Sequence, residues 1–363
     1  MPGVFVMRFF LPAIFMVLGC SEYTVSGLGD QNAGAEGEGG PGSDGDGDGT
    51  GNLEDGDIWG QICDPSGVGW AIDAHVYVDV DVDGDGVADW RAEDWTDEAG
   101  AFELVGVPTG EHTVYVEKGS FTTDFNVLLD VGGHQLPEAE CLDPESVNIA
   151  VVTGQYDAIE DILQEMNLSY DLYEGSFGQQ YLQLLSNPDA LAEYDIVFLN
   201  CGISENWIGQ SGQIGQSLMQ YVSAGGSIYA SDWAYYFVET GWPEAADFYG
   251  DDQMFSSAYV GKDGNIKANV INAEMQSALG SDIADINFDL SSWAVIESVG
   301  NAEVLLRGDA EVWDMWGASS ALQNVPLAFE IQDSGKVIYT TFHNERQITL
   351  DMQRLLTEMV LSL

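Results

Sequence analysis

Basic residues are scarce in this chain of 363 residues. It has nine Lys and Arg against 61 Asp and Glu, and its formal net charge is −52 at pH 7. So acidic a surface repels phosphate groups, which excludes nucleic acid and anionic membrane faces as partners and favours divalent cations. The acidic excess is typical of a surface adapted to salty surroundings and equally of a soluble extracellular protein, and both interpretations stay open.

Cysteine and histidine are also rare, with four of each. The histidines show no spacing typical of zinc ligands. The turn after the first expected strand of the C-terminal half, residues 153–156, has a single glycine and lacks the fingerprint of a phosphate-binding loop. We therefore expect no nucleotide cofactor.

The N-terminal apolar run, residues 9–19, is too short to cross a bilayer, which takes about 20 residues. The run ends in Val-Leu-Gly-Cys at 17–20, which resembles the lipobox of bacterial lipoproteins, whose cysteine becomes the lipidated first residue of the mature chain. The resemblance implies a signal peptide over 1–19 and a membrane anchor at Cys20. Because Ser21 rather than Asp follows the cysteine, it also implies export to the outer membrane or cell surface of a Gram-negative bacterium. A plain secretory signal is the alternative.

Residues 20–56 form an acidic, glycine-rich stretch. Eleven of the 25 residues from 27 to 51 are Gly, and Asp, Glu and Ser supply most of the rest. Such a composition cannot bury enough apolar area to offset the entropy that ordering costs. We expect a disordered tether between the anchor and the first folded domain.

Residues 57–145 alternate apolar and polar side chains between turns rich in Gly and Pro, which predicts an all-β, antiparallel sandwich. The segments at 60–64, 96–104 and 107–116 together resemble the carboxypeptidase regulatory-like domain, an Ig/transthyretin-like sandwich. The resemblance implies a non-catalytic spacer or adhesive module.

Two cysteines bracket this expected sandwich. Cys63 lies in its first strand and Cys141 just past its last, so in an exported protein we expect a disulfide between them. Since Cys20 is assigned to the lipid, Cys201 is left over, and we interpret it as a small buried thiol.

An acidic loop interrupts the sandwich at residues 81–89, which spell D-x-D-x-D-G-x-x-D. Alternating carboxylates on a loop bent by glycine are able to converge on one hard cation, and Ca²⁺ takes about six to eight oxygen ligands. The pattern resembles the calcium loops of dockerin and thrombospondin type 3 repeats. We predict a Ca²⁺ site formed by Asp81, Asp83, Asp85 and Asp89. A solvated acidic loop is the alternative.

Residues 146–363 alternate short buried strands, such as 147–152, 195–200 and 227–230, with amphipathic helices, and we expect the segment of mixed character at 241–324 to be an insertion. This order predicts an α/β domain with a flavodoxin-like, doubly wound parallel sheet. The segments at 194–200, 221–227 and 335–345 resemble the class I glutamine amidotransferase-like fold, near its trehalose-utilisation-protein-like relatives.

The resemblance also locates a candidate catalytic centre. In that family a cysteine on the turn after a strand works with a His-x-Glu pair. His343 and Glu345 fall where the pair belongs, but the turn holds Ser231 and Asp232 and no cysteine. One hypothesis is a hydrolase that uses Ser231 or Asp232 with His343 and Glu345. The other is a catalytically degenerate scaffold, which we favour because a carboxylate cannot simply replace a thiolate nucleophile.

Aromatic residues suggest a different use for the same cleft. Trp207 and Trp233 each come shortly after an expected strand, where ligands bind in open α/β sheets. Flat aromatic faces in that place suit stacking on sugar rings. The sequence thus predicts a non-catalytic, lipid-anchored envelope or surface protein that binds a ligand or protein partner, with a glycan as a candidate. The hydrolase and a purely structural spacer are the alternatives.

Overall fold

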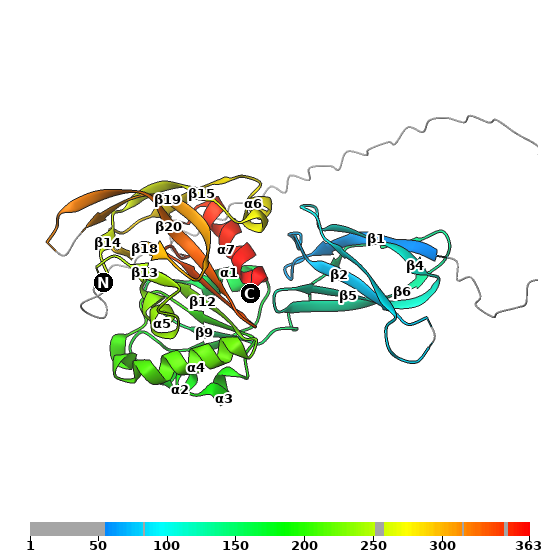
Figure 1. Ribbon diagram of the computed structural model, residues 1–363, viewed down its shortest axis with the longest axis horizontal. Coiled ribbons are helices and arrows are strands. Elements are labelled where there is room, and N and C mark those ends of the chain that lie inside the picture. Colours follow the sequence, from blue (N-terminus) through cyan, green and yellow to red (C-terminus); the bar gives the residue numbers. More distant parts are fainter. Residues whose placement is uncertain (1–54, 83, 251–257, 314–315, 345–347) are drawn as a thin grey trace, which may run out of the picture. The chain divides into compact units, whose positions relative to one another are not determined.

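The computed structural model describes residues 55–82, 84–250, 258–313, 316–344 and 348–363 (Figure 1). All of them belong to one unit, Asn52–Leu363. The predicted lipidation site Cys20, residues 20–54 of the expected tether, Asp83 and Glu345 lie outside the described residues, as does the side chain of Trp207, whereas residues 55–56 of the expected tether begin the first strand. None of the helices in the described part of the chain is both long and apolar enough to cross a bilayer.

Two four-stranded sheets form the N-terminal part. The first has the order β4-β1-β7 with β8 also on β1, and the second has the order β3-β2-β5-β6. Inward-facing side chains of both sheets, such as Ile58, Val76 and Val114, share one hydrophobic core, because alternate residues of a strand point to opposite faces. The strands are β1 (Asp55–Cys63), β2 (His75–Val80), β3 (Trp90–Trp95), β4 (Ala101–Pro108), β5 (Gly110–Lys118), β6 (Phe121–Leu129), β7 (His134–Gln135) and β8 (Glu140–Cys141).

The C-terminal part is built on a sheet that has eleven strands among the described residues, in the order β10-β9-β11-β12-β21-β20-β19-β14-β17, with β15 attached to β19 and β16 to β15. In this spatial order, the first five strands (β10, β9, β11, β12 and β21) pair parallel. Each following pair, beginning with β21 and β20, is antiparallel. They are β9 (Ile149–Val152), β10 (Asp171–Tyr173), β11 (Ile196–Leu199), β12 (Ser227–Ser231), β14 (Val260–Gly261), β15 (Gly264–Val270), β16 (Ile283–Phe288), β17 (Trp293–Ala294), β19 (Glu303–Trp313), β20 (Ser319–Gln332) and β21 (Lys336–Thr340). A separate pair joins β13 (Ala246–Phe248) to β18 (Ile296–Val299).

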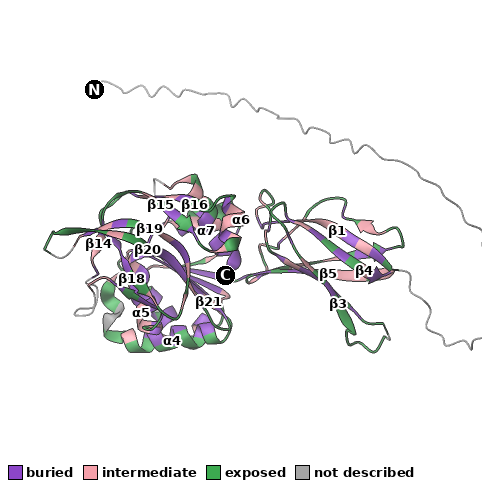
Figure 2. Cartoon of the chain, turned by 45° about the horizontal axis from the view of Figure 1, so that its top comes forward, coloured by how far each residue is buried: buried purple, intermediate pink, exposed green. Residues whose placement is uncertain are grey.

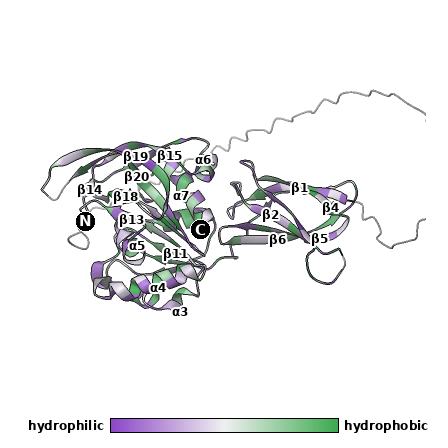
Figure 3. Cartoon of the chain, viewed as in Figure 1, coloured by the Kyte–Doolittle hydropathy of each residue, from purple (hydrophilic) through white to green (hydrophobic). Residues whose placement is uncertain are grey.

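Helices cover both faces of the inner parallel strands β9, β11 and β12, which are buried (Figure 2). Ile149 and Val151 of β9 pack in the core that contains residues of α1 and α7, whereas Ala150 and Val152 pack in the core with α2, α4 and α5. Hydrophobic and hydrophilic residues alternate along α4, whose buried residues include Leu218 (Figure 3). The helices are α1 (Ile159–Glu165), α2 (Gln180–Leu185), α3 (Pro188–Leu191), α4 (Ser211–Ser223), α5 (Tyr235–Gly241), α6 (Ala273–Leu279) and α7 (Leu350–Ser362), with 3-10 turns η1 (Glu205–Gln210) and η2 (Asp232–Ala234).

The predicted fold class, an all-β sandwich followed by a flavodoxin-like α/β domain, is wrong. Strands make up 41% of the described residues and helices 22%, in several sheets with a few short helices. The expected doubly wound sheet over 146–363 is a mixed sheet, because the segment predicted as an insertion (241–324) supplies the strands β14 to β17 and β19, and β20 extends to Ser319. Local periodicity identifies short buried parallel strands, but it does not show that a later antiparallel segment continues the same sheet.

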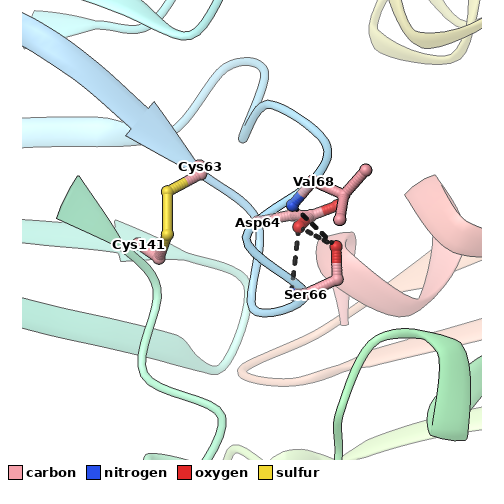
Figure 4. Close-up of a disulfide and its surroundings, with 5 residues drawn as sticks. All are labelled: Cys63, Asp64, Ser66, Val68 and Cys141. Carbon is pink, nitrogen blue, oxygen red and sulfur yellow. Dashed lines mark hydrogen bonds between the residues drawn. A yellow bond between two sulfur atoms is a disulfide. The ribbon is translucent and has the colours of Figure 1, made fainter. Parts of the chain in front are cut away.

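The cysteines at the two ends of the N-terminal sheets form a disulfide. Cys63 of β1 stands directly opposite Cys141 of β8, and the two sulfur atoms are bonded (Figure 4). After Cys63 the chain turns at Asp64, whose Oδ1 accepts a hydrogen bond from the backbone N–H of Ser66 (3.0 Å), and the Ser66 hydroxyl in turn accepts the N–H of Val68 (3.1 Å).

A buried lysine links β5 to the C-terminal helices. Lys118 is 4% exposed, lies 2.8 Å from a carboxylate oxygen of Glu358 in α7 and forms an ion pair with Glu274 in α6. Burial raises the pKa of Glu358 to about 7, although the charge of Lys118 opposes the shift. Burial also opposes ionisation of Glu274, but Lys118 outweighs it and lowers the pKa of that carboxyl.

Candidate functional site

Four parallel strands end along one edge of the C-terminal sheet. The register pairs β9 with β11, β11 with β12, and β12 with β21, where Ser231 stands opposite Thr340. The segments that directly follow these strands therefore meet at the carboxyl ends of the strands, the usual location of a ligand site in such sheets. The candidate residues Ser231, Asp232, Trp233 and His343 all lie there.

The turn after β12 has an unusual backbone. Asp232 has a φ of +45°, in the left-handed region that residues other than glycine rarely adopt. Two neighbouring elements hold it in place: Asp232 Oδ1 accepts the N–H of Ala294 (2.7 Å), and its backbone carbonyl accepts the hydroxyl of Tyr339 (2.9 Å). Such strain persists where the surroundings determine the conformation, and it is often found at functional sites.

Ser231 is fully buried and engaged on both sides. Its hydroxyl donates to Asp157 Oδ2 (2.5 Å) and accepts the backbone N–H of Cys201 (3.0 Å). A hydroxyl has one proton to donate, and here that proton points to Asp157 rather than to His343. Ser231 therefore connects the segments after β9 and β11 with the end of β12.

Asp157 is the buried centre of this hydrogen-bond network. Its Oδ1 accepts the backbone N–H of Asn344 (3.2 Å), whose side-chain amide donates to the carbonyl of Ala158 (2.6 Å). Burial raises the pKa of Asp157, and the charge of His343 and the hydrogen bond from Ser231 act in the opposite direction. Sequence reasoning missed Asp157; its place shortly after a buried strand was the available signal.

Cys201, Asp232 and His343 form a compact cluster. Asp232 Oδ2 lies 3.4 Å from Cys201 Sγ and 3.5 Å from His343 Nε2, and one ligand atom from each residue lies within 4.8 Å of the others. Cys201 is buried, as the sequence suggested, but it contacts the candidate site instead of packing away from it. Burial, with the nearby charge of Asp232 as a smaller cause, raises the pKa of this thiol well above its usual value.

A cavity of about 630 Å³ lies over this cluster. Its walls come from the segments after the parallel strands and from residues 287–293, within the stretch that the sequence had suggested was an insertion. Glu205 and Asp289 are exposed on it, and no Lys or Arg is among the described residues that line it. Apolar and aromatic lining residues include Tyr156, Ile203, Trp233, Tyr236, Leu290 and Trp293.

The two tryptophans predicted to bind ligand have different outcomes. Trp233 lines the cavity, is partly exposed, and donates its indole N–H to the carbonyl of Ser292 (2.5 Å), which fixes the ring. Trp207 lies in η1, and its side chain is outside the description. Trp293, which no sequence pattern singled out, is brought to the cavity by β17 and stacks on Phe288 with ring centroids 4.1 Å apart.

The predicted calcium loop connects β2 to β3. Asp81 accepts backbone N–H groups from Gly84 (2.7 Å) and Gly86 (2.8 Å), and Asp89 accepts that of Val82 (2.8 Å). Asp85 accepts a similar bond from within the loop. Among the described residues, the cluster at Cys201 rather than this loop brings three potential ligand atoms together. With Asp83 outside the description, calcium binding stays a prediction.

Comparisons with known proteins place this chain in no family. No family model matches it, and no curated protein does. Among solved structures, it is similar to PurLQS from Thermotoga maritima, with 12% identity and a TM-score of 0.37, over 59% of this chain and 97% of that one. At that TM-score the likeness carries neither a fold nor a function over to this chain.

Proposed function

We propose that this protein is a lipid-anchored envelope or surface protein whose C-terminal cavity binds an uncharged, hydroxyl-rich ligand of the glycan class. The observation that carries the proposal is the cavity of about 630 Å³ at the carboxyl ends of the parallel strands, which combines aromatic walls with carboxylates. Ligand pockets of this size are largely apolar and hold a few polar groups that orient the ligand.

The charge of the lining selects among ligand classes. Glu205, Asp232 and Asp289 offer hydrogen-bond acceptors, and His343 is the single basic side chain among the described lining residues. Phosphorylated or carboxylated ligands would meet repulsion without a Lys or Arg to offset it. Sugar hydroxyls, by contrast, donate to carboxylates, and the apolar face of a sugar ring suits the partly exposed ring of Trp233.

The geometry supports a binding role better than the Ser231 hydrolase. The hydrolase hypothesis makes His343 the partner that takes the proton of Ser231, whereas the Ser231 hydroxyl is fully buried and donates to Asp157. Anchoring at the envelope is supported by the lipobox resemblance at Cys20. The trehalose-utilisation-protein-like resemblance is compatible with a carbohydrate ligand.

Binding of neutral oligosaccharides, measured by titration calorimetry after a glycan-array screen, tests this proposal. Trp233→Ala should weaken binding at least about tenfold, equivalent to about 1.4 kcal/mol. Trp95→Ala, which removes a tryptophan exposed on β3, should leave binding unchanged and is the matched control.

Two results would contradict the proposal. One is a protein that binds only cationic or anionic ligands, or binds glycans equally well in both tryptophan variants. The other is turnover of glutamine, simple esters or peptides that is lost in both Ser231→Ala and His343→Ala, which would favour the hydrolase.

A further inference from the structure

Three different side chains that are common metal ligands converge at the floor of the cavity. Cys201 follows β11, Asp232 follows β12 and His343 follows β21, so adjacent parallel strands deliver them to one point. All three line the cavity, and one ligand atom from each lies within 4.8 Å of the others. We propose that Cys201 Sγ, Asp232 Oδ2 and His343 Nε2 bind a transition-metal ion of the Zn²⁺ class.

The two distances from Asp232 to the other ligand atoms suit a tetrahedral ion. With Zn–S near 2.3 Å and Zn–N and Zn–O near 2.0–2.1 Å, the donors of a tetrahedral site stand about 3.3–3.6 Å apart. Asp232 Oδ2 lies 3.4 Å from Cys201 Sγ and 3.5 Å from His343 Nε2. These two separations match those of a tetrahedral site, and the third pair, from Cys201 and His343, lies within 4.8 Å, so a bound ion would draw these two side chains together.

Surrounding groups orient the ligands. The second oxygen of Asp232 accepts the N–H of Ala294 (2.7 Å), which directs Oδ2 toward the cysteine and the histidine. The backbone N–H of Cys201 donates to Ser231 (3.0 Å), whose hydroxyl is held by Asp157. Hydrogen bonds of this kind, which fix the direction of the ligating side chains, accompany most protein metal sites.

The donor set selects the metal. Thiolate and imidazole ligands favour zinc and its neighbours among the transition metals, whereas Ca²⁺ and Mg²⁺ prefer all-oxygen sites. Binding removes the thiol proton of Cys201, which passes to solvent. Three protein ligands facing a cavity leave a fourth position for water or a ligand atom, as in open zinc sites.

The arrangement differs from that of a cysteine nucleophile with a catalytic base. In such a triad the histidine lies between the nucleophile and the carboxylate. Here one carboxylate oxygen of Asp232 contacts both Cys201 and His343. Three donors that surround one point fit a shared cation better than a relay of protons.

Cobalt substitution tests the site by a readout that requires neither ligand nor activity. The full chain carrying Cys20→Ser retains Cys201 as its remaining thiol, because Cys63 and Cys141 are joined. After chelator treatment it is titrated with Co²⁺ in excess Ca²⁺, which occupies surface carboxylates. We expect a thiolate-to-cobalt charge-transfer band that saturates at one ion per chain, with visible bands of tetrahedral Co²⁺, and Zn²⁺ should abolish both.

Variants identify the ligands. Cys201→Ser should remove the charge-transfer band, and His343→Gln and Asp232→Asn should each weaken Co²⁺ binding at least tenfold. His134→Gln, at a histidine in β7, is the matched control and should change nothing. Circular dichroism checks that each variant is folded.

The absence of a charge-transfer band at saturating Co²⁺, or a band that persists in Cys201→Ser, would overturn the proposal. If Cys201→Ser does not fold, an unchanged Co²⁺ affinity in both His343→Gln and Asp232→Asn would do so. The inference goes beyond the proposed function, and the two fail separately. A protein that binds the metal but no glycan would support the metal site and contradict the proposed function. Glycan binding without a cobalt spectrum would support the proposed function and overturn the metal site.

Discussion

Replacing Ser231 by alanine separates a structural role from a catalytic one. The change removes the donor to Asp157 and the acceptor of the Cys201 N–H, both of which are buried. An unsatisfied buried N–H costs about 1–3 kcal/mol, and a hydrogen bond to a charged group is worth about 1.5–3 kcal/mol. Allowing for relaxation around the site, we expect Ser231→Ala to lower the free energy of unfolding by about 3 kcal/mol.

Urea denaturation of the full chain in a Cys20→Ser background measures this loss. Ser362→Ala is the matched control, because Ser362 is buried in α7 but makes one neutral bond, to the carbonyl of Met359, whose loss costs about 1 kcal/mol. Since burial raises the pKa of Asp157, the deficit in Ser231→Ala should shrink at low pH, where that carboxyl is protonated in both proteins. A loss no greater than in Ser362→Ala, or unchanged stability with lost turnover, would refute the structural role.

Four further predictions concern other parts of the chain. The pKa of Glu358 is raised from 4.5 to about 7, so the folded state holds the proton of this carboxyl more tightly than the unfolded state does. The stability of the wild type should therefore fall by at most about 3 kcal/mol as pH rises from about 4.5 to 7. In a series of denaturation experiments at different pH, Glu358→Gln should make this slope flatter. Replacing both Cys63 and Cys141 by serine removes the disulfide that closes a 78-residue loop, and by the chain-entropy relation it should lower the free energy of unfolding by about 4.5 kcal/mol. Unchanged stability of the wild type after chemical reduction would contradict this. Ca²⁺ should raise the melting temperature of the wild type more than that of a variant in which the four aspartates of the loop 81–89 are replaced by asparagine. An equal rise in both proteins would indicate that Ca²⁺ only screens the surface charge. Cys20→Ser should abolish membrane fractionation, whereas detergent-free extraction of the unmodified wild type from washed membranes would exclude the anchor.

Local patterns in the sequence located most of the parallel strands. The buried runs at 147–152, 195–200 and 227–230 correspond to β9, β11 and β12, since a short apolar run between turns is buried on both faces whatever surrounds it. The turn at Ser231 and Asp232 was predicted for the same reason, since it directly follows the buried run at 227–230. These features depend on a few neighbouring residues.

The antiparallel half of the large sheet was beyond local patterns. β19 pairs with β20, and β20 with β21, so that residues 303–332 continue a sheet whose parallel strands begin far earlier in the chain. Whether a hairpin forms a separate insertion or extends an existing sheet depends on pairing across that sequence distance. The predicted fold class was therefore wrong although most of its parallel strands were placed.

The sequence alone determined the acidic composition and the location of the parallel-strand ends where the candidate site lies, because these follow from composition and from local order, whereas the export signal stays a prediction. Tertiary structure decided how the side chains at that address meet. Spacing along the chain relates neither Cys201 nor Asp232 to His343, so no zinc-ligand pattern was visible. Parallel pairing of β11, β12 and β21 places the three side chains within 4.8 Å of one another, since adjacent strands bring their ends together regardless of the sequence that separates them.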